Sequence, residues 1–336
     1  MTLSLPTAPP VPRDFVSPGL RTVLVAALVL FAVAPLWAGP AGLRLLMEAF
    51  SLLALAQMWN LLAGYTGLIS VGQQAFVGLG GYLFFALAMF LNVPLLVAIP
   101  AAAVATAVIA VPTGWVAFRL KGAYFAIGTW VIAEVFRLTM AQIGALGGGS
   151  GISLPVAIVR SLSADRFARE MIMYYIAFGL GVVSIVAVWG LLRSRWGLAL
   201  TAIRDSAPAA ESVGVRVEAV KFMVYVFVAF YTGLTGAFIF LQKLRITPDA
   251  AFSVNEWTAF VIFIVVIGGL GSIEGPIIGT VLFFLLRWIA ADWGAWYLMA
   301  MGAIAIAVMV VNRRGVWGAL RSAFGTLSVL PVSRRL

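Results

Sequence analysis

The chain has 336 residues, of which 63% are hydrophobic and only 10% are charged, and its formal net charge is +10. A soluble domain carries about 25% charged residues, so too few polar side chains exist here to cover a surface that faces water. Because there is no cysteine and no histidine, the sequence excludes disulfides, iron–sulfur clusters, ordinary zinc sites and histidine acid–base chemistry. The apolar runs do not alternate as barrel strands would, so they predict an all-α bundle in lipid.

About ten apolar runs are candidate membrane spans, and they predict a polytopic transmembrane helical bundle of about 8–10 spans. Most runs are roughly 17 to 23 residues long, which is enough to cross a hydrocarbon core. The eighth and ninth are short and also fit half-helices or re-entrant segments. The runs are Arg21–Trp37, Leu45–Ala63, Ala75–Leu91, Leu95–Phe118, Ala123–Ile143, Met171–Leu192, Phe222–Leu241, Glu256–Gly269, Pro276–Ala291 and Ala295–Val311.

The two ends of the chain are polar. Residues 1–20 are rich in proline and lack the order of a cleaved signal peptide, so we expect a flexible cytoplasmic tail there. Residues 21–315 are expected to form the transmembrane domain, and residues 316–336 a basic cytoplasmic tail. With both termini in the cytoplasm, about 14 of the 22 basic residues lie inside, as the positive-inside rule expects. Membrane orientation therefore explains the positive charge without a nucleic-acid partner.

The stretch Gly64–Gly81 is dense in glycine and contains the pair Gln73 and Gln74. Glycine is common where membrane helices approach closely, and it also permits a broken helix whose free backbone groups line a cavity. The two glutamines fit either environment. They can hydrogen-bond to neighbouring helices, or they can face a polar solute in such a cavity.

Glu134 lies in the middle of the fifth run, three residues before Arg137. This spacing allows an internal ion pair on one face of a helix, and a lone charge inside a bundle is costly. Contact with a polar solute is the alternative role for Glu134. Further along, the stretch Gly147–Ser153 predicts a flexible outer loop, which fits a gate, a docking surface or a simple linker.

The polar segment Arg193–Lys221 interrupts the apolar sequence and carries charges of both signs. Its spacing predicts two short helices joined by a tight turn, with Pro208 in the first turn of the second and a glycine at its end. Such a pair is suited to docking a soluble partner, and a solvated loop is the alternative. The candidate docking residues are Arg204, Asp205, Ala209, Ala210, Glu211 and Gly214.

Two mechanisms find no support in the residues. None of the three lysines follows a glycine, so the chain has no phosphate-binding loop for ATP. Acidic residues within the apolar runs are few and mostly lie near the ends of the runs, whereas ion-driven carriers place them deep in the bundle.

Several stretches together resemble one family. Arg-Asp followed by Ala-Ala-Glu-x-x-Gly is similar to the coupling segment of ABC-importer permeases. The other stretches resemble the branched-chain amino acid permeases, and their order and spacing resemble the M-type subunit, over about residues 60 to 315. They are NLLAGYTGLISVGQQAFVGLGGY at Asn60–Tyr82, RLKGAYFAIGTWVIAEVFRL at Arg119–Leu138, GGGSGIS at Gly147–Ser153 and VVIGGLGSIEGPIIG at Val265–Gly279.

The resemblance implies a non-catalytic permease subunit of type II architecture in the bacterial inner membrane. It implies a second related permease, two ABC ATPases and a periplasmic substrate-binding protein as partners, in a lipid environment. The substrate would be a branched-chain or related hydrophobic amino acid. The chain would bind no cofactor or metal, since ATP and magnesium belong to the ATPases. The residues proposed for the translocation path are Gly72, Gln73, Gln74, Gly78, Glu134, Gly148, Gly149 and Ser150.

Alternatives remain at this level. Relatives that carry urea, short amides or aromatic acids share the same motifs, and many family members have histidine where Gln73 stands. A different class of protein, an ion-coupled secondary transporter or a channel, would leave the segment Arg193–Lys221 as a solvated loop.

Overall fold

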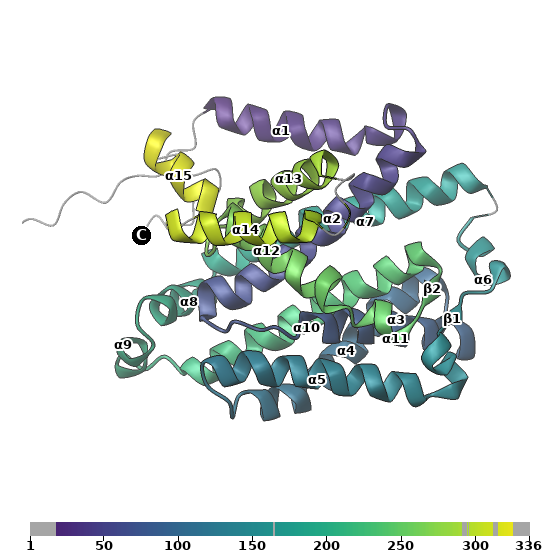
Figure 1. Ribbon diagram of the computed structural model, residues 1–336, viewed down its shortest axis with the longest axis horizontal. Coiled ribbons are helices and arrows are strands. Elements are labelled where there is room, and N and C mark those ends of the chain that lie inside the picture. The colour runs from purple at the N-terminus through teal and green to yellow at the C-terminus, as the bar shows by residue number, and fades with distance from the viewer. Residues whose placement is uncertain (1–17, 164, 291–293, 295, 312–314, 325–336) are drawn as a thin grey trace, which may run out of the picture.

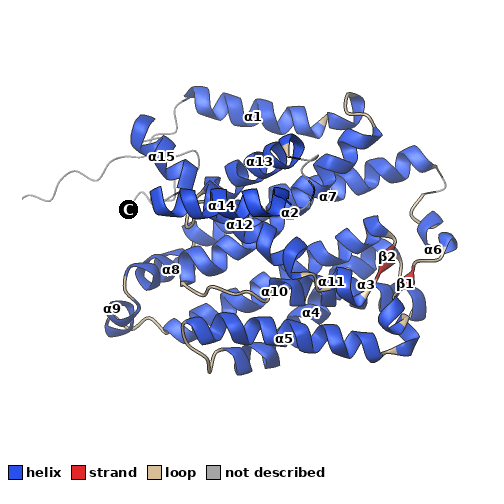
Figure 2. Ribbon diagram, viewed as in Figure 1, coloured by secondary structure: helices blue, strands red, loops and turns tan. Residues whose placement is uncertain are grey.

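The computed structural model describes residues 18–163, 165–290, 294, 296–311 and 315–324. Within these ranges nearly every element is a helix, apart from a pair of two-residue strands (Figure 2). The predicted all-α polytopic bundle is therefore confirmed. Most of the expected N-terminal tail, residues 1–17, and the last part of the C-terminal tail, residues 325–336, lie outside the described residues.

The elements carry the labels used in Figure 1. The helices that coincide with the expected spans are α1 (Pro18–Ala32), α2 (Pro40–Asn60), α3 (Gln73–Phe90), α4 (Leu95–Ala117), α5 (Ala123–Gln142), α7 (Arg166–Arg193), α10 (Val217–Lys243), α12 (Phe260–Gly268), α13 (Glu274–Ile289) and α14 (Trp296–Val311). The other helices and strands are α6 (Val156–Arg160), α8 (Arg195–Asp205), α9 (Ala207–Ser212), α11 (Pro248–Ala251), α15 (Gly315–Phe324), β1 (Ile152–Ser153) and β2 (Arg245–Ile246). The 3-10 turns are η1 (Ala34–Leu36), η3 (Gly144–Leu146) and η4 (Gly148–Ser150), and the π-helical turns are η2 (Leu61–Tyr65) and η5 (Asn255–Ala259).

Seven helices of the described part are long and apolar enough to cross a membrane, or up to eight if the bent pair α14 and α15 forms one span. Three of the expected spans are short helices, because α1 has 15 residues and α13 and α14 have 16 each. The expected short span Glu256–Gly269 belongs to a longer helical stretch, Pro248–Gly268, which passes the same criterion.

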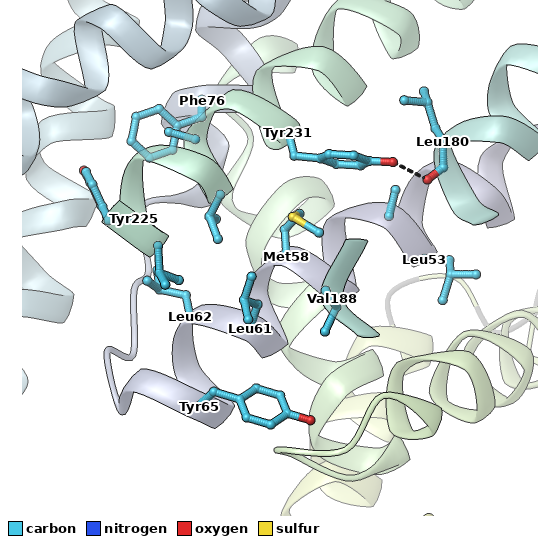
Figure 3. Close-up of a cluster of buried hydrophobic side chains, with 14 of the residues drawn as sticks. Leu53, Met58, Leu61, Leu62, Tyr65, Phe76, Leu180, Val188, Tyr225 and Tyr231 are labelled. Carbon is cyan, nitrogen blue, oxygen red and sulfur yellow. Dashed lines mark hydrogen bonds between the residues drawn. The ribbon is translucent and has the colours of Figure 1, made fainter. Parts of the chain in front are cut away.

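The interior of the bundle consists chiefly of α2, α3 and α10. The most apolar segments of α2 with η2 and of α10 each have 78% of their residues buried, and that of α3 has 72%. In the same measure, only 17% of α5 is buried. Figure 3 shows part of this core, where Met58 of α2 lies among Phe76 of α3 and Val188 of α7. There the hydroxyl of Tyr231 donates a hydrogen bond to the carbonyl oxygen of Leu180 at 2.6 Å.

Helices α3 and α10 approach so closely that only glycine fits between them. A Cβ atom on Gly80 would lie 2.1 Å from the carbonyl oxygen of Gly233, and one on Gly236 would lie 2.3 Å from that of Val77. Small residues allow membrane helices to approach in this way. Part of the glycine-dense stretch therefore serves helix packing.

The chain is not helical between the end of α2 with η2 and the start of α3. Residues 67–72 make this connection, and Gly67 adopts a positive φ of 73°. The connection runs from the α8 end of the molecule back toward its middle, so that α3 begins deep in the bundle (Figure 1). The interruption of the helix that these glycines permit is therefore present between η2 and α3.

The two ends of the molecule differ. Strand β1 pairs antiparallel with β2, with Ile152 opposite Ile246. Helices α8 and α9 lie at the opposite end, where α15 also lies (Figure 1). Residues 316–324 of the expected C-terminal tail are helical, because they belong to α15, which packs against α12 and α13.

Candidate functional site

The segment Arg193–Lys221 forms the two short helices that its spacing predicts. The hydroxyl of Ser194 accepts a hydrogen bond from the first turn of α8, and that of Ser206 accepts one from Ala209 N at 3.4 Å in α9. Pro208 lies in the first turn of α9, and Gly214 follows its end with a φ of 88°. Serine caps, an early proline and a left-handed glycine are the signals expected at helix ends.

The helix pair α8–α9 is anchored on one side and exposed on the other. Gly197, Leu200 and Ile203 of α8 are buried, and so is Ala210, which was expected among the docking residues and instead anchors α9. The other five candidates are exposed to solvent on the protruding end of the molecule. They are Arg204, Asp205, Ala209, Glu211 and Gly214.

Arg204 also faces inward. Its guanidinium carbon lies 5.8 Å from the centre of the Tyr65 ring in η2, and its Nε lies 3.6 Å from a carboxylate oxygen of Asp205. A Cβ atom on Gly271 would lie 3.8 Å from its Nη1. Arg204 therefore links α8 to the end of the α2 stretch, and its guanidinium lies near the turn between α12 and α13.

Two buried amide side chains fasten that turn to α2. The Asn60 side chain donates to the carbonyl oxygen of Ser272 and accepts from the backbone N–H of Gly271, both at 2.8 Å. Gln57 Nε2 donates to the carbonyl oxygen of Ile273 at 2.7 Å. We call these contacts the amide cluster. The sequence alone did not reveal this cluster. The signal that could have found it is that Gln57 and Asn60 are polar amides within an apolar run.

The glutamine pair lies at the buried start of α3. Gln73 Nε2 donates to the carbonyl oxygen of Leu55 at 2.9 Å, and Gln74 Oε1 accepts from the hydroxyl of Thr258. Both side chains are less than 4% exposed, which favours the packing role in this conformation. Gln73 Oε1 and Gln74 Nε2 nevertheless have no hydrogen-bond partner, so each amide retains one unused polar atom.

The two glycines proposed for the path make close contacts as well. A Cβ atom on Gly72 would lie 2.2 Å from the carbonyl oxygen of Thr129 in α5, and one on Gly78 would lie 2.4 Å from the Phe252 ring. The start of α3 is therefore wedged between α5 and the region after α10.

The expected ion pair between Glu134 and Arg137 is confirmed, with 2.5 Å between Arg137 Nη2 and Glu134 Oε1. Arg137 Nη1 also lies 2.6 Å from Asp249 Oδ1 in α11, a partner that the sequence spacing did not reveal. The three charged groups are only partly covered by the rest of the chain, and α5 is the least buried of the long helices.

The loop that contains Gly148, Gly149 and Ser150 lies at the strand end of the molecule, opposite the end where α8 and α9 lie (Figure 1). Arg245 Nη2 donates to the carbonyl oxygen of Ser150 at 3.3 Å, beside the β1–β2 pair. Gly149 is exposed, and a Cβ atom there would meet nothing within 4 Å. The candidate residues therefore lie in three separate groups. One group is at the α8–α9 end, one is at the start of α3 and in α5, and one is at the strand end.

The amino-acid sequence matches known proteins over most of its length. The profile of a family described as the permease component of the branched-chain amino acid transport system matches residues 41–316. The chain is similar to the high-affinity branched-chain amino acid transport system permease protein LivM of Escherichia coli strain K12, with 26% identity over 320 residues, 88% of this chain and 74% of that protein. It is also similar to LivM of Salmonella typhimurium strain LT2, with 25% identity over 318 residues and the same coverage.

No solved structure matches the chain. The family match begins in α2 and ends in α15, so it includes all the candidate residues described above. The chain belongs to the family of permease components of branched-chain amino acid transport systems.

Proposed function

We propose that this chain is the membrane-spanning permease subunit of an ATP-driven ABC importer that carries branched-chain or related hydrophobic amino acids across the bacterial inner membrane. The observation that carries the proposal is the family match across residues 41–316, nearly the whole described bundle. Both curated relatives are named for branched-chain amino acid transport, which supports this substrate class over urea, short amides or aromatic acids.

The helix pair α8–α9 is the docking surface for the ATPases in this proposal, on the cytoplasmic side, where both termini also lie. The support is its protrusion, its mixed charge and its buried anchors. Two ABC ATPases bind there, and a second related permease completes the path. A periplasmic binding protein delivers substrate at the opposite end, near Gly148, Gly149 and Ser150. ATP and magnesium are bound by the ATPases, and this chain binds no cofactor.

Closure of the ATPase pair moves α8–α9 as a rigid body. Arg204 passes this movement to Tyr65, because its guanidinium lies over that ring. The amide cluster then couples α2 to α12 and α13, since its three hydrogen bonds join these elements.

The two permeases share a central path in this proposal. The start of α3 contributes Gly72, Gln73, Gln74 and Gly78, and α5 contributes Glu134. The polar atoms of Gln73 and Gln74 that lack partners are the groups available to a substrate when the helices shift.

A charge reversal tests the docking surface. Glu211→Arg leaves α9 and its buried anchors intact but reverses an exposed charge, so we expect the ATPases to co-purify at least about tenfold less. The double change Arg204→Glu with Asp205→Arg should act in the same direction. The measurements are co-purification in mild detergent and substrate-stimulated ATP hydrolysis in liposomes.

Arg160→Glu, an exposed change at the strand end of the molecule, is the matched control for co-purification, and the ATPases should co-purify with it as with the unaltered chain. Normal stimulated hydrolysis in the Glu211→Arg variant would show that α9 does not dock the ATPase. Uptake that persists without any ATPase would instead identify an ion-coupled transporter.

A further inference from the structure

A charged cavity lies apart from all the candidate residues described above. It has a volume of about 350 Å³ and is enclosed by α2, the end of α10, η5 with the start of α12, and the last turns of α13. Glu48, Lys243, Glu256 and Arg287 are its charged lining, and Leu52 and Phe260 contribute to its apolar wall.

The cavity lies at the strand end of the membrane-spanning bundle. Lys243 is the last residue of α10, two residues before β2 begins, and Arg287 is in the last turn of α13. Charged side chains at the ends of spans reach the membrane interface at small cost, whereas those at the centre do not. The cavity is therefore at the depth where hydrocarbon gives way to polar groups.

The four charges form two ion pairs that bridge different helices. Arg287 Nη1 lies 2.5 Å from Glu48 Oε1, which joins α13 to α2. Lys243 Nζ lies 3.0 Å from Glu256 Oε2, which joins α10 to η5. All four side chains are between 41% and 45% exposed, so they are accessible from the cavity while they are paired.

This lining is neutral overall but contains separate positive and negative sites. A ligand with a single charge would leave one partner of a pair uncompensated in a partly apolar site, which is unfavourable. A zwitterion can instead place its ammonium group at a carboxylate and its oxyanion at the guanidinium or ammonium group. Its apolar portion would lie against Leu52 and Phe260, and Trp257 also lines the site.

We propose that this cavity binds a zwitterion in which a primary ammonium group lies a few bonds from an oxyanion and is followed by an apolar group. Two sources have this chemistry: a free hydrophobic α-amino acid and an ethanolamine phospholipid of the surrounding membrane. Only the amino-acid source rests on the proposed transport function. On α13 the exposed Leu285 and Trp288 flank Arg287 and provide an apolar surface for lipid chains.

The test is direct binding to the full chain purified in detergent, followed by native mass spectrometry and by the shift of the unfolding midpoint. The probes are L-leucine and a short-chain phosphatidylethanolamine, whose masses distinguish the two sources. The matched probes without an ammonium group are isocaproate and a short-chain phosphatidylglycerol. We expect saturable binding of leucine, of phosphatidylethanolamine or of both in competition, and at least about tenfold weaker binding of the matched probes.

Paired neutral substitutions locate the site without leaving a lone charge. Glu48→Gln with Arg287→Gln, and separately Lys243→Gln with Glu256→Gln, should each weaken binding at least about tenfold. The control is Arg166→Gln with Glu170→Gln, which removes an exposed ion pair in α7 outside the cavity and should leave binding unchanged.

The proposal is overturned if neither zwitterion binds, if the probes without ammonium bind equally well, or if both paired variants bind as the unaltered chain does. None of these measurements requires ATPases or transport. If the zwitterion proposal fails, the importer proposal is unaffected. Loss of ATPase docking likewise does not affect the zwitterion proposal.

Discussion

A tight constraint at the scale of single residues is the lack of a side chain at Gly80. Its α-carbon faces the backbone of Gly233 so closely that any Cβ atom would overlap a carbonyl oxygen. Backbone cannot move aside as the end of a flexible side chain can, so the two helices themselves would have to separate.

Gly80→Ala should therefore destabilise the protein by about 1–3 kcal/mol, the usual cost of overpacking a core. The measurement is the midpoint of unfolding in detergent. Gly179→Ala is the matched control, because a Cβ atom there meets nothing within 4 Å in the middle of α7. It should be neutral or stabilise the helix by up to about 1 kcal/mol. Equal midpoints for the two variants would contradict the close contact between α3 and α10.

Sequence spacing could predict contacts within one helix but not those between distant segments. Glu134 and Arg137 are three residues apart, so helix geometry alone places them together. Asp249 completes the same cluster from 112 positions away, and only the packing of α11 beside α5 reveals it. For the same reason the spacing predicted helix α9 but not that Ala210 would be its buried anchor.

The important contact at the scale of elements is the one between α8 and η2. Arg204 lies over the face of the Tyr65 ring, and this contact joins the exposed helix pair to the end of the α2 stretch, which also carries the amide cluster. A guanidinium near an aromatic ring is attracted by the electrons of its face, so the attraction depends on the ring and not on the hydroxyl.

Tyr65→Leu should accordingly lower leucine uptake severalfold while the ATPases still co-purify, because the docking surface is unchanged. Tyr65→Phe keeps the ring and should retain most of the uptake. Uptake in liposomes and co-purification are measured on the same preparations. If the Tyr65→Leu variant takes up leucine at the normal rate, the movement of α8–α9 reaches the bundle by another route.

Most of the elements could be predicted because membrane spans depend on length and composition, which are local properties. The amide cluster could not, since Gln57 and Ile273 are 216 positions apart. The start of α3 in the middle of the bundle was also out of reach. Glycine permits a broken helix, but where the chain re-enters the bundle depends on contacts with α5 and α10.

At the scale of the whole molecule, α5 is the helix that this chain covers least. Only 17% of its membrane segment is buried, yet it carries Glu134 and Arg137 near its middle. Partly exposed charges at that depth are costly against lipid, and they normally face protein or a water-filled path. We therefore expect the second permease to lie against α5.

Cross-linking tests this arrangement, and the chain suits it because it contains no cysteine. A benzophenone attached to the variant Val131→Cys on α5 should cross-link to a second permease in the assembled complex. The same label on Val108→Cys, an exposed position on α4, should react with lipid only. The reverse pattern would place the partner against α4.

The strand pair β1–β2 has a mechanical consequence for such an assembly. It ties the chain that follows α5 to the chain that follows α10 by backbone hydrogen bonds, whereas near their other ends these helices meet through side chains such as Phe125 and Phe222, which both pack on Phe118. Helix α5 is about 30 Å long, and a sideways displacement of about 5 Å at its α8–α9 end would turn it by about 10° around the strand pair. With the short ribbon as a pivot, a push at the α8–α9 end would open the helices at that end while the strand end stays closed.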